Sequence, residues 1–278
     1  MKKMVFLDVD GTLVGHDQRV SKPVRDAIEA ARKNGHGVFL CTGRNRAGIQ
    51  ALLNIGFDGM ICSAGGYIEV NGQVIHTCYL TEAEVNEARD IFDRHHVLYN
   101  MEATDTTFQS EEMSHLFVSQ RIDGENANSE LARLMEEQKN TYNIHALKDF
   151  DAHPLPIHKL CFIAGSLSDL DEAKEKLSDR FHFIIHEMFS KHTLNGEIIN
   201  KKMDKGMAVK KVAAYFNVPL TDTIGIGDSM NDLEMIQTCG TGVVMANGSE
   251  ALKKHADMIC ESVEKDGVAD AFKQLGLY

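Results

Sequence analysis

Short apolar runs alternate with helical patterns over the first forty residues of the chain. Val5-Phe6-Leu7 forms an apolar run that ends at a carboxylate, and Ser21 then starts an amphipathic stretch with Pro23 in its first turn. That stretch ends at Asn34-Gly35, and a second apolar run covers residues 38–41. A strand, a helix and a strand of these lengths predict a right-handed βαβ unit with a parallel sheet.

The pattern changes in the middle of the chain. A helix through Ile49, Leu52 and Leu53 leads to a short strand at 60–62, and residues 67–76 alternate around Asn71-Gly72, which predicts a hairpin. The next hundred residues predict a small module with an antiparallel sheet and about two helices. Its expected helices cover 81–95, 129–139 and 169–177, its expected strands cover 97–101, 160–164 and 181–185, and a loop carries Pro154 and Pro156.

The first pattern resumes near residue 188. A helix at 205–216, a strand at 223–226, a helix ending at Cys239 and a strand at 242–245 extend the parallel sheet. The chain of 278 residues is long enough for two cores. We therefore predict an α/β fold in which residues 1–81 and 188–278 form a core domain with a parallel sheet, and residues 82–187 form an inserted α/β cap domain.

Composition narrows the function classes. The chain has 41 acidic and 29 basic residues, a net charge of −12, and no stretch rich in Lys or Arg, so nucleic acid is not expected as a partner. Its six cysteines include no C-x-x-C pair, which favours buried, reduced thiols over disulfides or a zinc site. No apolar run is long enough for a signal peptide or a membrane span, and we expect a cytoplasmic protein without a membrane partner.

The first strand ends in the feature with the clearest chemical meaning. Asp8 and Asp10 follow Leu7 at spacing i and i+2, and Gly11-Thr12 comes next. Two carboxylates at a strand end converge on the edge where α/β sheets bind ligands. One can attack phosphorus while the other exchanges a proton with the leaving alcohol and the attacking water, which is phosphoryl transfer. Because carboxylates repel a phosphate dianion, this chemistry needs a divalent cation. The plainer interpretation is a loop that caps a helix.

Further polar residues stand at predicted strand ends or helix starts. Thr42 can donate its hydroxyl and Gly43 its backbone N–H to phosphate oxygens, and Lys205 can neutralise a nucleophile. Asp228 offers a third carboxylate to Mg²⁺, and Asp232 is placed to hold Lys205 or a metal-bound water. The T-G pair and the lysine are each weak evidence alone, whereas G-D-x-x-N-D at 227–232 together with D-x-D-G-T predicts a phosphoryl-transfer site.

The whole chain resembles the haloacid dehalogenase-like hydrolase superfamily, and within it the Cof-type phosphatases with a large α/β cap of type IIB. The motifs that carry the resemblance are D-V-D-G-T at 8–12, T-G-R at 42–44, D-K-G at 204–206 and G-D-S-M-N-D at 227–232, in the family's order. The resemblance implies a Rossmann-like three-layer core, a cap that sets substrate specificity, and a phosphatase that acts on phosphoric monoesters.

It also implies roles for individual residues. Asp8 would be the nucleophile, forming an aspartyl-phosphate, and Asp10 the general acid and base. The Asp8 carboxylate, the Asp10 backbone carbonyl and the Asp228 carboxylate would hold Mg²⁺. The residues that would bind substrate or phosphate are Thr42, Gly43, Lys205 and Asn231. One departure is visible, because Ala64 in Ser63-Ala64-Gly65-Gly66 stands where relatives often have Asn.

Several alternatives stay open at this stage. The expected substrate is a small phosphorylated metabolite such as a sugar phosphate, a nucleotide-like cofactor or pyridoxal phosphate, but a phosphomutase or a phosphoacceptor or phosphometabolite-binding regulatory protein would use similar residues. A dehalogenase would need neither Asp10 nor Asp228. A monomer and a homodimer are equally compatible with the sequence. Histidines 95, 96, 182 and 186 lack carboxylate or Cys partners at metal-ligand spacing. Of the histidines, His186 and His192 near the expected cap hinge are the ones placed to touch substrate.

Overall fold

The computed structural model describes residues 2–113, 143–185 and 194–278, which form two compact units. The first unit comprises Met1–Arg44, Ile49–Thr77 and Met203–Tyr278, and the second comprises Asn45–Gly48 and Cys78–Lys202. The predicted boundary at 187/188 differs from this division, because strand β11 (Leu194–Asn200) pairs on both of its sides with strands of the second unit. The α/β class, with a parallel sheet and an inserted α/β unit, is confirmed.

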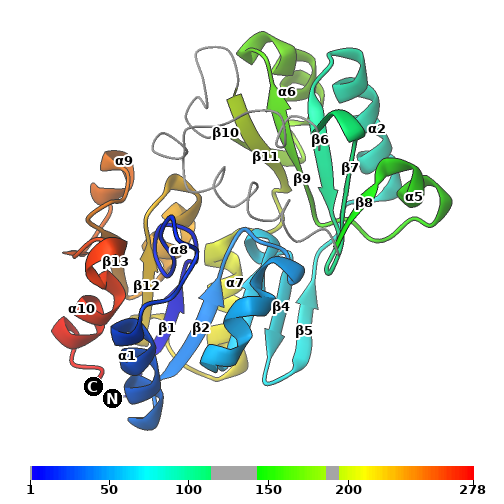
Figure 1. Ribbon diagram of the computed structural model, residues 1–278. Helices are drawn as coiled ribbons and strands as arrows, with labels where there is room; N and C mark the ends of the chain where they lie inside the picture. The colour runs from blue at the N-terminus through cyan, green and yellow to red at the C-terminus, as the bar shows by residue number, and fades with distance from the viewer. Residues whose placement is uncertain (1, 114–142, 186–193) are drawn as a thin grey trace. The chain divides into compact units, whose positions relative to one another are not determined.

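An eight-stranded sheet forms the centre of the first unit, in the order β14-β13-β12-β1-β2-β3-β4-β5 (Figure 1). The strands from β14 to β3 are parallel, and the predicted hairpin adds β4 and β5 antiparallel at one edge. The strands are β1 (Met4–Leu7), β2 (Gly37–Cys41), β3 (Gly59–Cys62), β4 (Tyr67–Val70), β5 (Gln73–Thr77), β12 (Thr223–Gly227), β13 (Thr241–Met245) and β14 (Met258–Cys260).

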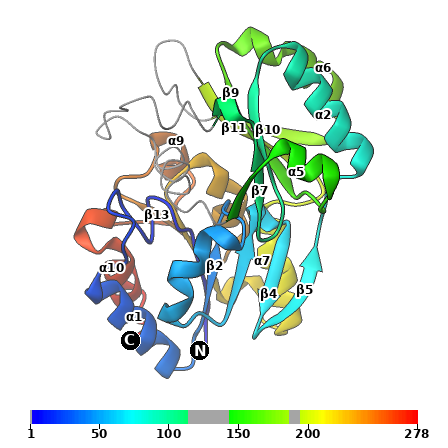
Figure 2. The ribbon, with the colours of Figure 1, turned by 45° about the vertical axis from the view of Figure 1, so that its right-hand side comes forward.

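Helices cover both faces of this sheet, which gives three layers (Figures 1 and 2). On one face, α1 and α10 pack together over Val5, Leu7 and Val38. On the other face α7 and α8 pack together, and Phe6 stacks on Phe39 at 5.3 Å between ring centroids. The helices are α1 (Lys22–Lys33), α7 (Lys205–Tyr215), α8 (Leu233–Thr238), α9 (Glu250–Lys253) and α10 (Gly267–Gln274), with 3₁₀ turns η1 (Ala47–Ile55), η2 (Ser63–Gly65), η6 (Leu220–Asp222), η7 (Met230–Asp232) and η8 (Val263–Lys265).

Local sequence signals explain where the helices begin. The Ser21 hydroxyl accepts from the backbone N–H of Val24 at the start of α1, and the Asp204 carboxylate accepts from the N–H of Met207 at the start of α7. The helix predicted through Ile49 is present in the tighter 3₁₀ form. The Asp204 cap makes Lys205 the first residue of α7.

The second unit is built on a six-stranded sheet in the order β10-β11-β9-β6-β7-β8, antiparallel except for the parallel pair β7 and β8. Helices α2 and α6 pack together, and their apolar residues join those of the sheet in one core. The elements are α2 (Glu82–Arg94), β6 (Leu98–Glu102), β7 (Thr107–Gln109), β8 (Ile144–Ala146), α5 (Leu147–Ala152), β9 (Lys159–Ala164), η5 (Leu167–Leu170), α6 (Asp171–Leu177), β10 (Phe181–Ile185) and β11. The helix predicted at 129–139 lies outside the described residues.

One face of this second sheet is buried but polar. The Lys159 ammonium is fully buried and lies 2.7 Å from a Glu197 carboxylate oxygen and 3.5 Å from one of Glu102. The Cys161 thiol donates to the other Glu102 oxygen at 3.2 Å. A buried ion pair of this kind is held by its partners, since an isolated buried charge is strongly unfavourable.

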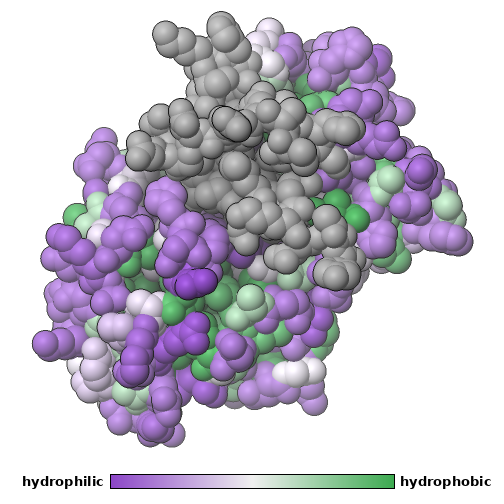
Figure 3. Space-filling view, viewed as in Figure 1, coloured by the Kyte–Doolittle hydropathy of each residue, from purple (hydrophilic) through white to green (hydrophobic). Residues whose placement is uncertain are grey.

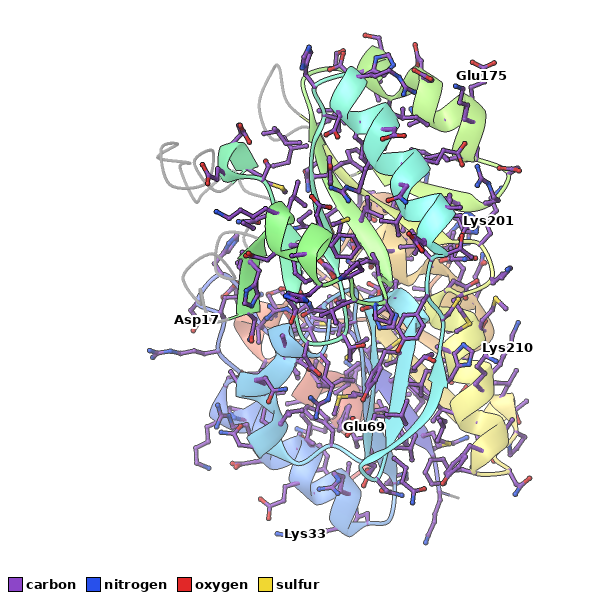
Figure 4. All side chains as sticks on the ribbon, turned by 90° about the vertical axis from the view of Figure 1, so that its right-hand side faces the viewer. Asp17, Lys33, Glu69, Glu175, Lys201 and Lys210 are labelled. Carbon is purple, nitrogen blue, oxygen red and sulfur yellow. The ribbon has the colours of Figure 1, made fainter. Side chains whose placement is uncertain are left out.

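The cysteines of the chain are reduced, as their spacing predicts. All six cysteines are free thiols, five of them buried and Cys78 half-buried. Hydrophilic side chains cover much of the described surface on the face shown in Figure 3, and exposed charged residues such as Asp17, Lys33 and Lys201 lie at the periphery in Figure 4. Among the described segments, no helix is both long enough and apolar enough to cross a membrane.

Candidate active site

The carboxyl ends of three neighbouring parallel strands bring the predicted residues to one edge of the first sheet. β1 lies between β12 and β2, with Leu7 opposite both Ile226 and Leu40. Asp8 follows β1, its N–H donating to the carbonyl of Ile226 at 2.9 Å, and Asp228 follows β12. The register of the sheet therefore sets these two carboxylates side by side.

Lys205 is the centre of the site. Its ammonium is buried and donates to Asp8 Oδ1 at 2.7 Å, to Asp232 Oδ1 at 2.6 Å and to Asn231 Oδ1 at 3.3 Å. Burial alone would lower the pKa of Lys205, but the carboxylates of Asp232 and Asp8 outweigh it and raise that pKa well above its usual range. Lys205 is therefore a permanent cation that directly contacts the predicted nucleophile.

Asp232 holds the loop after β12 as well as Lys205. Its Oδ2 accepts from the backbone N–H of Asp228 at 3.0 Å and of Ser229 at 3.2 Å. A side chain at Gly227 would place its Cβ 2.5 Å from the Asp232 carboxyl carbon, so glycine is needed for this close approach. Since both Asp232 oxygens already accept hydrogen bonds, its contacts are those of a residue that orients others.

Asp8 and Asp228 form an acidic pair without enough compensating charge. Burial, together with the charge of Asp232, raises the pKa of Asp8 to about 8 against a usual 3.8. Burial and the charge of Asp8 raise the pKa of Asp228 well above its usual range. Oxygens of Asp8, Asp228 and Asp232 all lie within 4.8 Å of one another. Among the described residues, the buried Oδ1 of Asp228 has no hydrogen-bond partner.

These features fit a small divalent cation. Hard cations take carboxylate and carbonyl oxygens, and Mg²⁺ is usually held by one or two carboxylates and several waters. The predicted ligand set of Asp8, Asp10 and Asp228 overlaps the acidic cluster at Asp8 and Asp228. The Asp10 carboxylate accepts hydrogen bonds from Arg44, and the predicted ligand atom of Asp10 is its backbone carbonyl oxygen. A Cβ at Gly11 would lie 2.2 Å from an Asp228 oxygen, so only glycine leaves room beside this carboxylate.

Asp10 is paired with a residue that sequence reasoning did not place in the site. Arg44 Nε donates to Asp10 Oδ2 at 2.8 Å and its Nη2 donates to Asp10 Oδ1. The signal in the sequence was the arginine of T-G-R, directly after β2, but nothing in the pattern names its partner. Gln18, whose side-chain carbonyl also accepts from Arg44 Nη2, carried no signal at all.

Thr42 and Gly43 lie buried at the end of β2. The Thr42 hydroxyl oxygen accepts from the N–H of Arg44 at 3.1 Å, which leaves its own hydrogen to be donated. All eight predicted site residues thus belong to the first unit. Hydrogen bonds connect Asp8, Lys205, Asn231 and Asp232 directly, and connect Asp10 and Thr42 through Arg44.

The structure also describes Ala64 and some of the histidines that the sequence singled out. Ala64 has a φ of +53°, a left-handed conformation that Asn tolerates better than Ala, so the backbone itself favours the Asn that was expected at this position. His95 Nε2 is hydrogen-bonded to a Glu172 carboxylate oxygen at 2.7 Å in the second unit. His186 and His192 lie outside the described residues.

A three-layer α/β core with convergent aspartates and a buried lysine at its strand ends defines a hydrolase of phosphoric monoesters. The chain belongs to the haloacid dehalogenase-like hydrolase family, whose model matches residues 5–272. It is 29% identical to the putative phosphatase YxeH of Bacillus subtilis, over all of this chain and 99% of that protein. It is 27% identical to the 5-amino-6-(5-phospho-D-ribitylamino)uracil phosphatase YwtE of B. subtilis, covering 98% of each.

Solved structures show the same fold. The subclass IIB sugar phosphatase BT4131 of the family superimposes with a TM-score of 0.77 at 21% identity, and each chain is covered completely. This likeness includes the inserted α/β unit, which agrees with the Cof-type, large-cap architecture predicted from the motifs. The family model and the curated relatives named as phosphatases together assign the chain to the hydrolases of phosphoric monoesters.

Proposed function

We propose that this chain is a Mg²⁺-dependent phosphatase that hydrolyses monoesters of small metabolites through an aspartyl-phosphate on Asp8. The observation that carries the proposal is the contact of Lys205 with Asp8 at 2.7 Å, beside a carboxylate oxygen of Asp228 that has no hydrogen-bond partner within the described part of the chain. The contact with Lys205 neutralises the charge of the nucleophile, and the Asp228 oxygen is available to a cation.

Residues of this chain supply each step. Lys205 stabilises the ionised form of Asp8, whose oxygen attacks phosphorus while the bond from phosphorus to the ester oxygen breaks. Asp10 gives its proton to the departing ester oxygen. A water then attacks the phosphorus, Asp10 takes the proton of that water, and the bond to Asp8 breaks to release phosphate. Thr42 and Gly43 donate hydrogen bonds to the phosphoryl oxygens through these steps.

The Asp8 and Asp228 carboxylates and the Asp10 carbonyl would hold the cation, which would offset the repulsion between these carboxylates and the phosphoryl oxygens. Asn231, which accepts from Lys205, would bind the same phosphoryl group through its amide N–H. Asp232 would keep Lys205 in place.

We infer the substrate class from the names of the similar proteins, because the described residues do not define a binding site for the rest of the substrate. YwtE is named for a phosphorylated ribityl compound and BT4131 is called a sugar phosphatase. We therefore propose sugar and polyol phosphates first, with nucleotide-like cofactors and pyridoxal phosphate next, and the inserted unit as the cap that selects among them. Six free thiols suit the reducing cytoplasm as the place of this reaction.

The test is phosphate release from a panel of sugar phosphates, ribityl phosphates, flavin mononucleotide and pyridoxal phosphate, with Mg²⁺ or with a chelator. Wild type should release phosphate only with Mg²⁺, and Asp8→Asn should release none while keeping its circular dichroism spectrum. Equal release by Asp8→Asn would overturn the mechanism. A stable phosphorylated protein in intact mass spectra, without phosphate release, would instead favour the phosphomutase or the phosphoacceptor.

A further inference from the structure

Arg44 binds the Asp10 carboxylate with two parallel hydrogen bonds, a geometry that a lysine ammonium could not provide. Its Nε and Nη2 each donate to a different oxygen of the same carboxylate, the first at 2.8 Å. Both side chains are about nine-tenths buried. A two-bond contact between a planar guanidinium and a carboxylate fixes the carboxylate plane as well as its position.

Arg44 itself is held on two sides. The Gln18 side-chain carbonyl accepts from Arg44 Nη2, and the Gln18 amide donates to the carbonyl of Gly15 at 3.2 Å, which ties it to its own loop. The backbone N–H of Arg44 donates to the Thr42 hydroxyl at 3.1 Å, and its carbonyl accepts from Ser63 at 2.7 Å. The guanidinium therefore has little freedom to follow Asp10, and Asp10 must instead follow the guanidinium.

We propose that Arg44, braced by Gln18, is a positioning residue that holds the Asp10 carboxyl for proton transfer to the leaving group. The inference rests on the proposed function, because it assigns to Asp10 the role of general acid. Each oxygen of a carboxyl group has two acceptor directions, so the pair with Arg44 occupies one direction on each oxygen and leaves the other for the reaction. A fixed acid needs no rearrangement when the ester bond breaks.

The simpler alternative is that Arg44 only offsets charge among Asp8, Asp10, Asp228 and Asp232. Arg44→Lys separates the two ideas, because it keeps the positive charge and loses the planar two-bond contact. Under the charge-only alternative this variant resembles wild type. Under the positioning proposal it is impaired, and only where the leaving group needs a proton.

The experiment compares kcat/KM for phenyl phosphate and p-nitrophenyl phosphate. Phenol is the weaker acid, so its departure depends more on protonation by Asp10, while p-nitrophenolate leaves readily without it. General acids contribute about 10²- to 10⁴-fold, so imperfect placement in Arg44→Lys should lower kcat/KM for phenyl phosphate by roughly 10-fold or more. The loss for p-nitrophenyl phosphate should stay within about 3-fold, as expected where proton transfer contributes little. Gln18→Leu, which retains Arg44, should show the same selectivity at a smaller size.

A double-variant cycle supplies the decisive result. If Arg44 acts through Asp10, adding Arg44→Lys to Asp10→Asn should cause no further loss with phenyl phosphate, since coupled residues are not additive. Equal losses on both esters in Arg44→Lys, or additive losses in the double variant, would overturn the proposal. Wild type that releases phosphate from neither aryl ester nor any metabolite of the panel, or Asp8→Asn that still releases it, would overturn the proposed function and not the pairing.

Discussion

Replacement of Asp8 by Asn should make the metal-free protein more stable at neutral pH. Asp8 has a pKa of about 8 in the folded chain, raised by burial and by Asp232, against 3.8 usually. The folded state thus keeps a proton that the unfolded state has released, so this group lowers stability as pH rises from about 4 to 8. Asn has no proton to lose and removes that pH dependence.

The size of the effect follows from the same shift. One pKa unit corresponds to about 1.4 kcal/mol, so at pH 7 the unfavourable contribution of Asp8 is on the order of 4 kcal/mol. Against this, the Asn amide places an extra N–H donor in a buried site beside the Lys205 ammonium, and an unpaired buried donor costs roughly 2 kcal/mol. The expected net gain for Asp8→Asn is about 2 kcal/mol at pH 7, the difference of these two contributions.

Thermal melting in EDTA between pH 5 and pH 8 measures this gain. Asp8→Asn should melt several degrees above wild type at pH 8 and approach it near pH 5, and Mg²⁺ should raise the melting temperature of wild type only. Asp26→Asn is the matched control, because the Asp26 side chain is 59% exposed and lies on α1. An Asp8→Asn protein that melts below wild type at every pH, with an undiminished response to Mg²⁺, would refute the electrostatic argument.

Three further substitutions test other parts of the structure. Lys159→Met should destabilise the chain by about 3–5 kcal/mol in urea titrations, because two buried glutamates lose their shared cation, and an unchanged midpoint would contradict that. Gly227→Ala forces a Cβ to within 2.5 Å of the Asp232 carboxyl carbon and should reduce kcat/KM by about 10- to 100-fold, as misplacement near 1 Å does, in phosphate-release assays. Gly72→Ala is its control, since beyond the chain neighbours no atom of the described residues lies within 4 Å of a Cβ there, and it should retain activity at a cost of about 1 kcal/mol for its positive φ. Ala64→Gly should raise the free energy of unfolding by roughly 1 kcal/mol, because glycine adopts a φ of +53° without strain, and a lower denaturant midpoint would count against this.

Site residues could be predicted from the sequence where a polar residue directly follows a predicted strand. Asp8, Thr42 and Asp228 each come after an apolar run, and the topology of a parallel sheet brings such ends to one edge. Lys205 could be placed because its N-cap, Asp204, marks the start of a helix. For these residues, local pattern and sheet topology were sufficient.

Contacts between distant side chains could not be predicted in the same way. The pair of Arg44 with Asp10 depends on where two loops meet, and Gln18 joins them from a third position with no pattern of its own. β11 was missed because its sequence, Leu194–Asn200, contains Asn, Gly and Glu, which are poor strand residues. It is a strand because β9 and β10 pair with it on both sides, a tertiary effect that overrides propensity.

The order of strands in the first sheet has a consequence for synthesis of the chain. β1 pairs with β12, yet residue 223 leaves the ribosome long after residue 7, by roughly 10 to 40 s at typical translation rates. During that interval the backbone N–H and C=O groups on one edge of β1 have no partner strand. An unpaired edge of an apolar strand is a site for aggregation and for chaperone binding. A chain whose translation stops before β12 always lacks Asp228, and it also lacks Lys205 if translation stops before that residue. Incomplete chains are therefore expected to have no activity.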